Sequence, residues 1–310
     1  MKRTSLIAAT AVAAALALAG CSGSATSTDA NTPASPVGEA YSIGITQITT
    51  HTALDSAREG FKKAFEDAGI QVKYDEQNAQ GDQATATSIA SKFASSDLDL
   101  VLAIATPSAQ AAAQSITKVP VLFTAVTDPV SAQLVNSLEA PGSNITGTTD
   151  MNPVADQISL VKEFAPKAKT LGVIYSSGEV NSEVQVELAK VAAAKDGLQV
   201  VESAVTNSAE VQQAAQDLAS KVDAIYVPTD NTVVSALASV VQAAEDAKIP
   251  LIAGEANSVA QGAQPTESTT RSSDTRPVKW RSGSSRKELN PRASPSKRKR
   301  TTNSRSTRRL

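Results

Sequence analysis

The chain has 310 residues, of which 41% are apolar, and this length is enough for two domains of ordinary size. The formal net charge of −2 hides an asymmetry: residues 264–310 carry 14 Lys and Arg against 3 Asp and Glu, whereas residues 1–263 carry 15 against 28. A single cysteine excludes an intramolecular disulfide. The chain has a single histidine, and no second Cys or second His to join it, which in practice excludes a zinc site.

The first twenty residues have the pattern of a targeting segment. Lys2 and Arg3 precede an apolar run, 6–19, that is too short for an ordinary membrane span. The run ends in LAGC, which resembles the lipobox of bacterial lipoproteins and predicts lipidation of Cys21. A plain secretory signal with a chance cysteine is the alternative. Residues 21–40 are rich in Ser, Thr, Ala and Pro, as expected of a flexible linker between a membrane surface and an exported domain.

From residue 41 the chain alternates apolar, β-prone runs with helical patterns. Residues 41–47 predict a strand, and the helical pattern after them places Leu54, Phe61 and Phe65 on one face before Gly69. Strands that alternate with helices indicate a parallel sheet covered on both faces. The further elements predicted here are strand 70–74, helix 82–95, strand 97–103, helix 107–116 and strand 121–125.

Residues 119–151 join this part to a second part built on the same plan. The apolar run 121–125 ends in a polar turn, TDP at 127–129, and ligands of open α/β sheets bind at the carboxyl ends of strands. We expect the whole stretch to act as a binding loop and a hinge. Its remaining predicted elements are a short helix over 131–138, a turn at 141–142 and an extended crossover over 145–149.

The second part repeats the pattern of the first. The interval from Gly44 to Gly69 recurs as Gly172 to Gly197. The sequence therefore predicts an α/β fold of two Rossmann-like lobes, 41–147 and 148–262, with parallel sheets and a hinge. The predicted elements are strand 171–175, helix 182–195 with Val184, Leu188, Val191 and Ala192 inward, strand 198–201, helix 209–220, strand 222–227, helix 232–247 and strand 250–253.

The loops at the carboxyl ends of these strands are expected to line a cleft. They contain carboxylates and many hydroxyl and amide groups but no Lys or Arg, which disfavours a phosphate ligand and favours an amine. Polar residues before helices can leave backbone N–H groups free for a ligand carboxylate. A free amino acid satisfies both conditions. The predicted ligand-binding residues are His51, Thr106, Thr127, Asp128, Ser176, Glu179, Asn181, Asp230, Asn231 and Glu255.

Other interpretations of these residues stay open. Asp230 and Asn231 also fit simple helix caps, and His51 taken alone indicates a loop residue. The chain has no G-x-S-x-G elbow, no G-x-G-x-x-G after the first strand and no P-loop lysine, which argues against a hydrolase or a nucleotide-dependent enzyme. We therefore expect a binding protein that needs no cofactor or metal, with a lipid-anchored α/β enzyme as the distant alternative.

Several motifs resemble those of TrpX/YtrP-like ABC transporter substrate-binding lipoproteins. The longest begins with TDPV at 127–130 and continues with LV at 134–135, SL at 137–138, PG at 141–142, Asn144 and TG at 146–147. The others are GITQ at 44–47, LGVIY at 171–175 and DNT at 230–232. The resemblance covers about residues 41–262 and departs at Gln133, where the family usually has glycine. It implies a type I periplasmic-binding fold whose hinged cleft captures a small solute, often an aromatic amino acid, for a membrane permease.

The resemblance also implies which partners and which location to expect for this chain. We expect a monomer, lipid-anchored on the extracytoplasmic face of the cell membrane, that binds a small solute and an ABC permease but no nucleic acid. A sugar- or nucleoside-binding receptor of the same fold is the nearest alternative. It is less favoured, because sugar sites stack the ring on aromatic side chains and Tyr175 is the one aromatic residue in the predicted loops.

Residues 263–310 form a basic tail of low complexity that cannot bury a core and is predicted to be disordered. A basic arm for nucleic acid or acidic lipid is one interpretation. A frameshift is the other: residues 264–281, encoded with chosen synonymous codons and read two bases on, give TYGIDYSQLGYAAGEMA, which resembles the strand, turn and helix that follow in the family. Resequencing the gene decides between them, because an intact reading frame would exclude the frameshift.

Overall fold

The computed structural model describes residues 40–259 and 261–263. Within these ranges no helix is both long and apolar enough to cross a membrane. The predicted signal segment 1–20, with Cys21, the linker up to residue 39 and the basic tail from residue 264 lie outside the described residues, so the hypotheses about them stay predictions.

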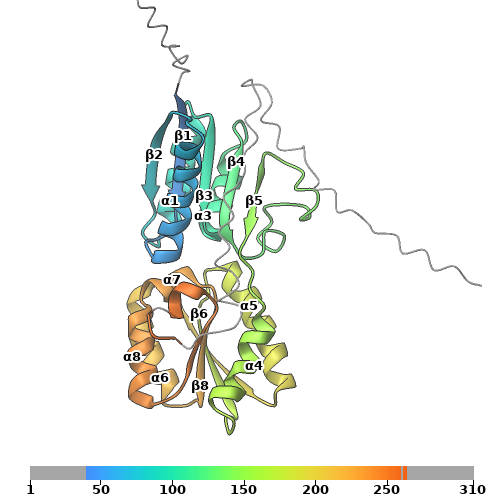
Figure 1. Cartoon of the computed structure of the whole chain (residues 1–310), viewed down its shortest axis with the longest axis vertical. Coiled ribbons are helices and arrows are strands. Elements are labelled where there is room, and N and C mark those ends of the chain that lie inside the picture. The colour runs from blue at the N-terminus through green and yellow to red at the C-terminus, as the bar shows by residue number, and fades with distance from the viewer. Residues whose placement is uncertain (1–39, 260, 264–310) are drawn as a thin grey trace, which may run out of the picture. The chain divides into compact units, whose positions relative to one another are not determined.

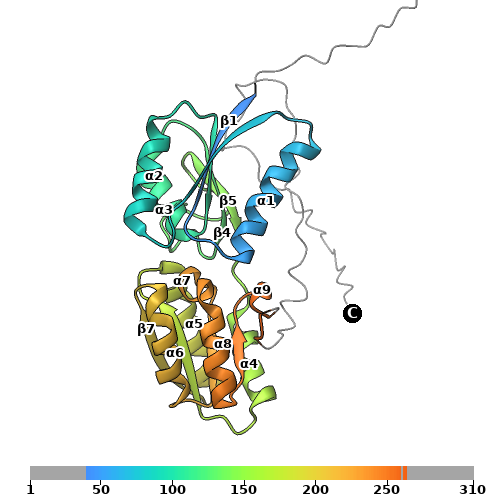
Figure 2. The same ribbon diagram turned by 90° about the vertical axis from the view of Figure 1, so that its left-hand side faces the viewer.

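The first lobe is a five-stranded parallel sheet with strand order β2-β1-β3-β4-β5 (Figure 1). Figure 2 shows α1 on one face of this sheet and α2 and α3 on the other. The strands are β1 (Tyr41–Gln47), β2 (Val72–Asn78), β3 (Leu100–Ile104), β4 (Val121–Val126) and β5 (Ile145–Thr149). The helices are α1 (Thr52–Asp67), α2 (Gln83–Ser95) and α3 (Thr106–Ser115).

The second lobe is a four-stranded parallel sheet with strand order β7-β6-β8-β9. Helices α4 and α5 pack together against one face, and α6 and α8 pack against the other. The strands are β6 (Thr170–Ser176), β7 (Gln199–Val205), β8 (Ala224–Val227) and β9 (Leu251–Ala253). The helical elements are α4 (Val154–Phe164), α5 (Val180–Lys195), η1 (Ser208–Glu210), α6 (Val211–Ala219), α7 (Asn231–Ser235), α8 (Leu237–Ala247) and α9 (Ala256–Val259).

Strands β3 and β8, in the interior of their sheets, are buried along their whole length. This is expected for continuous apolar runs in parallel sheets covered on both faces. Neighbouring residues of β6 alternate between the two layers: Val173 joins the cluster under α4 and α5, and Ile174 joins the cluster under α6 and α8. The predicted α/β architecture, with two parallel sheets covered on both faces, is therefore confirmed.

The repeated glycines have the same role in both lobes. A Cβ on Gly44 would lie 2.9 Å from the side chains of Phe93 and Leu98, and one on Gly172 would lie 2.8 Å from Leu218. A strand glycine thus lets a helix approach the sheet closely. The second glycine of each pair follows a helix with positive φ, +67° at Gly69 and +68° at Gly197, which is the usual left-handed helix ending.

The helix predicted over 131–138 is wrong. The chain forms successive turns there, in which the N–H groups of Leu134 and Val135 both donate to the Pro129 carbonyl. Gln133 has φ of +59°, a left-handed conformation that interrupts a helix and explains why glycine suits this position.

The inward face predicted for α5 is also wrong in part. Leu188 and Val191 are 44% and 58% exposed, although Ala192 is buried as predicted. The helix instead turns Asn181 and Gln185 inward, because Gln185 pairs with the loop after β8: its Nε2 donates to the Thr229 carbonyl and its Oε1 accepts from the Thr229 N–H, both at 3.0 Å. Buried hydrogen bonds, rather than apolar periodicity, set the rotation of this helix.

Three helical segments differ from the prediction in number or continuity. The helix predicted over 232–247 is divided into α7 and α8 at Ala236, whose φ of −119° and ψ of 23° are not helical. Helices α4 and α9 were not predicted. Helix α4 follows β5, close to the end of the stretch 119–151 that was expected to act as a hinge, and α9 follows β9.

Candidate functional site

A pocket lies at the carboxyl ends of the strands of both sheets. Its lining contains three carboxylate-bearing residues and one imidazole, and no Lys or Arg belongs to it within the described part of the chain. Parallel strands bring all of these loops to one edge of each sheet. The first lobe contributes His51, Ala53, Leu54, Ala125, Thr127 and Asp150, and the second contributes Asn181, Thr229, Asp230, Asn231 and Glu255.

The structure brings most of the predicted ligand-binding residues together at this pocket. His51, Thr127, Asn181, Asp230, Asn231 and Glu255 line it, whereas Thr106, Asp128, Ser176 and Glu179 are not among its lining residues. Asp150 was missed because residues 145–149 were interpreted as a crossover. The segment is the edge strand β5, paired in parallel with β4, so Asp150 follows its carboxyl end as the other candidates follow theirs.

Several pocket-lining polar atoms are buried and have no hydrogen-bond partner within residues 40–259 and 261–263. They are His51 Nδ1, Asp150 Oδ1, Asn181 Oδ1 and Thr229 Oγ1. Buried polar atoms are nearly always paired in native proteins, so a cluster of unpaired ones requires an explanation. Their gathering around one pocket indicates a site built to hydrogen-bond a polar ligand.

The Glu179 carboxylate has no free capacity for such a ligand. Its Oε1 accepts from the Thr232 N–H at 2.9 Å and from the Thr232 hydroxyl at 2.7 Å. Its Oε2 accepts from the N–H and the side-chain amide of Asn231 and from the Asn181 amide. Glu179 therefore ties the start of α5 to the start of α7.

Asp230 is saturated in the same way. Its Oδ2 accepts from the Ser176 N–H and the Ser182 hydroxyl, both at 2.6 Å, and its Oδ1 accepts from the Val233 N–H at 2.6 Å. Burial, and then the nearby Glu179 carboxylate, raise the pKa of Asp230, while these three hydrogen bonds oppose the shift. The geometry makes Asp230 a brace between loops as well as a cap of α7.

Asp128 caps its own turn. Its Oδ1 accepts from the Val130 and Ser131 N–H groups at 3.1 and 3.0 Å, and its Oδ2 accepts from the Ser131 hydroxyl at 2.7 Å. These contacts hold the irregular segment after β4 rather than a group in the pocket.

Asp150 and Glu255 are the acidic side chains that keep capacity for a cation. Burial raises the pKa of Asp150 to about 6, against a side-chain hydrogen bond with Thr127 that lowers it. Burial, with the neighbouring Asp150 charge as a smaller cause, raises the pKa of Glu255 to about 7. The Ser258 hydroxyl donates to Glu255 Oε1 at 3.2 Å, but neither carboxylate forms an ion pair with a Lys, Arg or His within the described ranges. An ammonium group between them would do so.

The start of α3 offers the complementary feature. Thr106 and Ser108 are buried, and neither hydroxyl has a hydrogen-bond partner in the described part of the chain. They stand at the first turn of a ten-residue helix, where backbone N–H groups have no intrahelical partner. Ala105 precedes them with φ of +77°, a strained turn for a residue with a Cβ. Hydroxyls and N–H groups at a helix start suit a carboxylate.

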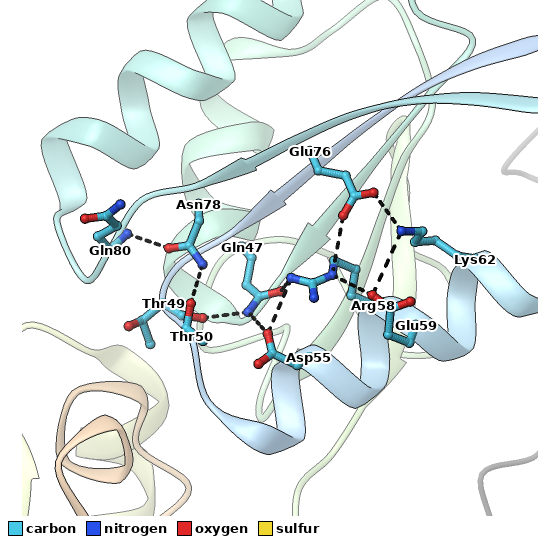
Figure 3. A network of polar contacts seen from close by, with 10 residues as sticks. All are labelled: Gln47, Thr49, Thr50, Asp55, Arg58, Glu59, Lys62, Glu76, Asn78 and Gln80. Carbon is cyan, nitrogen blue, oxygen red and sulfur yellow. Dashed lines mark hydrogen bonds and ion pairs between the residues drawn. The ribbon is translucent and has the colours of Figure 1, made fainter.

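A polar network fixes the loop that carries His51 (Figure 3). The buried Gln47 at the end of β1 donates to the Thr49 carbonyl at 2.7 Å and to Asp55 Oδ1 at 2.8 Å, and accepts from Arg58 at 3.2 Å. On the far side, Asn78 donates to the Thr50 hydroxyl at 3.0 Å. Residues 48–51 are thus held from both β2 and α1.

The chain is similar to known substrate-binding proteins. The family model for ABC transporter substrate binding proteins matches residues 42–270. A tyrosine-binding protein of Clostridioides difficile is 49% identical over 225 residues, which are 71% of this chain and 65% of the relative. The chain thus spans just under two thirds of the length of the curated relatives it matches.

Two solved structures add to this comparison. An ABC domain from Streptococcus pneumoniae in complex with L-Trp is 39% identical, with a TM-score of 0.66, covering 69% of this chain and 74% of that one. The ligand-free, open structure of a substrate-binding protein with adhesive properties from Clostridium difficile is 51% identical, with a TM-score of 0.52, covering 72% and 77%.

Proposed function

This chain belongs to the ABC transporter substrate-binding proteins, and from that premise we propose that it captures an aromatic amino acid and delivers it to a membrane permease. The observation that carries the proposal is that one edge of the first sheet has both an acidic residue, Asp150, and the start of α3 with its hydroxyl and N–H groups. Asp150, with Glu255, would hold the ammonium group, and the start of α3 would hold the carboxylate. No step of bond making or breaking is needed for this role.

The pocket walls and the similar proteins both favour a solute with an aromatic side chain. Ala53, Leu54 and Ala125 provide a small apolar surface against which a ring could pack once the cavity is opened. A tyrosine-binding protein and a structure holding L-Trp are among the similar proteins.

Entry of the solute would need a hinge movement. The cavity between the lining residues measures about 20 Å³, which is room for about one water molecule. Within the described residues one segment, after β5, runs from the first sheet to the second. Asn152 in this segment donates through Nδ2 to the Gly254 carbonyl, just after β9, at 2.8 Å. Bending at this segment would open the cavity, and contacts from both lobes to the solute would favour closure.

A thermal-shift screen tests the proposed function. Tyrosine and tryptophan are expected to raise the melting temperature, because a ligand at a hundred times its Kd stabilises the folded state by about 2.7 kcal/mol. Sugars and nucleosides serve as controls. An unchanged melting temperature with every amino acid would contradict the proposal, and chemical conversion of the bound compound would show an enzyme instead.

Solute affinity is expected to fall as the pH drops. A pKa of about 7 leaves Glu255 roughly half protonated at pH 7, and Asp150 follows at about 6, yet the ammonium group needs the ionised forms. Binding at pH 7 should therefore release protons, seen as a calorimetric heat that differs between phosphate and Tris buffers, and affinity should fall about tenfold or more between pH 8 and pH 5.

The folding stability of the solute-free protein should change with pH in the opposite direction to the solute affinity. Both folded-state pKa values lie above the ordinary values of 3.8 and 4.5, so the folded state binds more protons than the unfolded state between about pH 4 and 7. These two groups therefore make stability fall as pH rises through that window. Equal heats in both buffers, or affinity that is flat from pH 8 to pH 5, would remove the two carboxylates from the ammonium site.

Anchoring at the membrane is part of the proposal. The LAGC sequence at 18–21 supports lipidation of Cys21 and an extracytoplasmic location. Cys21→Ser is expected to release the protein from the membrane fraction or leave an uncleaved precursor. A variant that is processed and fractionates like the wild type would argue against a lipoprotein.

A further inference from the structure

His51 presents an unusual nitrogen to the pocket. The residue stands at the N-cap of α1, but its side chain makes no capping hydrogen bond, and it lines the pocket. Its Nδ1 is buried and has no hydrogen-bond partner among residues 40–259 and 261–263. Neither helix capping nor a contact within the described protein explains this atom.

The surrounding hydrogen bonds favour one position for the proton on the His51 ring. Asn231 Nδ2 donates to the saturated Glu179 carboxylate, so Asn231 Oδ1 must be the amide atom that faces His51, at 3.5 Å from Nε2. An amide oxygen only accepts hydrogen bonds, so this contact is a hydrogen bond when Nε2 carries the hydrogen, which favours that tautomer. Burial lowers the pKa of His51 against the opposing effects of Asn231, Asp55 and Glu179, which favours the neutral ring. The remaining nitrogen, Nδ1, is left as a hydrogen-bond acceptor.

The order of the strands places this acceptor opposite the ammonium site. His51 follows β1, the start of α3 follows β3, and Asp150 follows β5, with β4 between the last two. Three strand spacings, about 14 Å, separate β1 from β5. A solute with its ammonium group at Asp150 and its carboxylate at α3 would therefore extend its side chain toward His51.

We infer that His51 determines specificity, by accepting through Nδ1 a hydrogen bond from a donor on the solute's aromatic ring. This inference rests on the proposed function. A phenolic hydroxyl or an indole N–H supplies the donor, whereas the ring of phenylalanine supplies none. Binding phenylalanine would bury Nδ1 unpaired, and a site built around a hydrogen bond discriminates strongly against an analogue that lacks it.

The network of Figure 3 gives the acceptor a fixed position. Gln47 is about 1% exposed and holds both the Thr49 carbonyl and the first turn of α1 through Asp55. Arg58 in turn holds Gln47 and lies 3.4 Å from Asp55. A loop held in this way loses little freedom when the solute binds, which sharpens discrimination between similar rings.

Calorimetry with three solutes and two proteins tests the inference. The wild type is expected to bind tyrosine and tryptophan at least about tenfold more tightly than phenylalanine, the usual effect of one buried hydrogen bond. In His51→Leu the ratio of tyrosine to phenylalanine affinity should fall to about one. The ratio is informative even if the substitution changes all affinities together.

The protonation state can be measured directly in the wild type. His51 is the only histidine in the sequence, so a tag without histidine leaves one imidazole in a ¹⁵N-histidine NMR spectrum. The expected pattern is a protonated Nε2 and a bare Nδ1, whose resonance shifts on addition of tyrosine and stays in place on addition of phenylalanine.

The outcomes separate the two hypotheses. A wild type that binds the three solutes equally, or that carries its proton on Nδ1, overturns the role of His51 and leaves the amino-acid receptor standing. Absence of binding by all three solutes would overturn both. A His51→Leu variant that keeps the full preference for tyrosine would also overturn the inference, whatever its stability.

Discussion

Asp150→Asn is expected to lower the affinity for an aromatic amino acid by about two to three orders of magnitude, the usual effect of removing one partner from a buried, hydrogen-bonded charge pair. The substitution keeps the shape of the side chain and removes the charge that would face the ammonium group. Isothermal titration calorimetry at pH 8, where both acidic residues are ionised, gives the measurement.

The same substitution should not weaken the solute-free protein. The raised pKa of Asp150 shows that its ionised form is costly in the folded state, so a neutral amide is expected to be tolerated or to raise the melting temperature. Asp128→Asn is the matched control, because Asp128 caps its own turn. If Asp128→Asn lowered the affinity as much as Asp150→Asn, the ammonium group would have to be placed at the segment after β4.

Asp230→Ala is expected to lower the free energy of unfolding by about 3–5 kcal/mol, because it leaves three buried donors unpaired. The Ser176 N–H, the Ser182 hydroxyl and the Val233 N–H all depend on this carboxylate. For a protein of this size the loss corresponds to about 10 °C in melting temperature. Urea denaturation and calorimetry measure both quantities.

Asp217→Ala provides the control for this loss. The Asp217 carboxylate is exposed and accepts at 2.9 Å from Gln213 of the same helix, so its removal should change stability by less than about 0.5 kcal/mol. An Asp230→Ala protein as stable as the wild type but with weaker solute binding would show that Asp230 contacts the solute, as the sequence alone had suggested.

Some features of the fold follow from local sequence. Continuous apolar runs such as 100–104 form central strands wherever helices cover both faces, and glycines such as Gly69 and Gly197 end helices in either lobe. The two-lobed α/β architecture could therefore be predicted, because local patterns specify each element and parallel topology specifies how the elements connect. Parallel topology also places the loops that follow the strands at one edge of the sheet, which is why most candidate residues line one pocket.

The rotation of α5 and the turns after β4 could not be predicted in the same way. Apolar residues occur on two faces of α5, and the choice between them depends on Gln185 pairing with Thr229, 44 residues further along the chain. Gln133 has a side chain that permits a helix, yet its backbone is left-handed because the surrounding turn requires it. Propensity is a weak guide where distant contacts decide the backbone.

The sequence by itself determined that this protein has an acidic, cation-free cleft edge in an α/β fold, because composition and strand order are enough for that. Only the tertiary structure decided which carboxylates are available to a solute. Glu179 and Asp230 accept hydrogen bonds from donors that lie about fifty residues away in the chain, whereas Asp150 Oδ1 has no partner among the described residues and Glu255 accepts only from the Ser258 hydroxyl there. The physical reason is that the availability of a charged group depends on its hydrogen-bond partners, and in this fold those partners come from other loops.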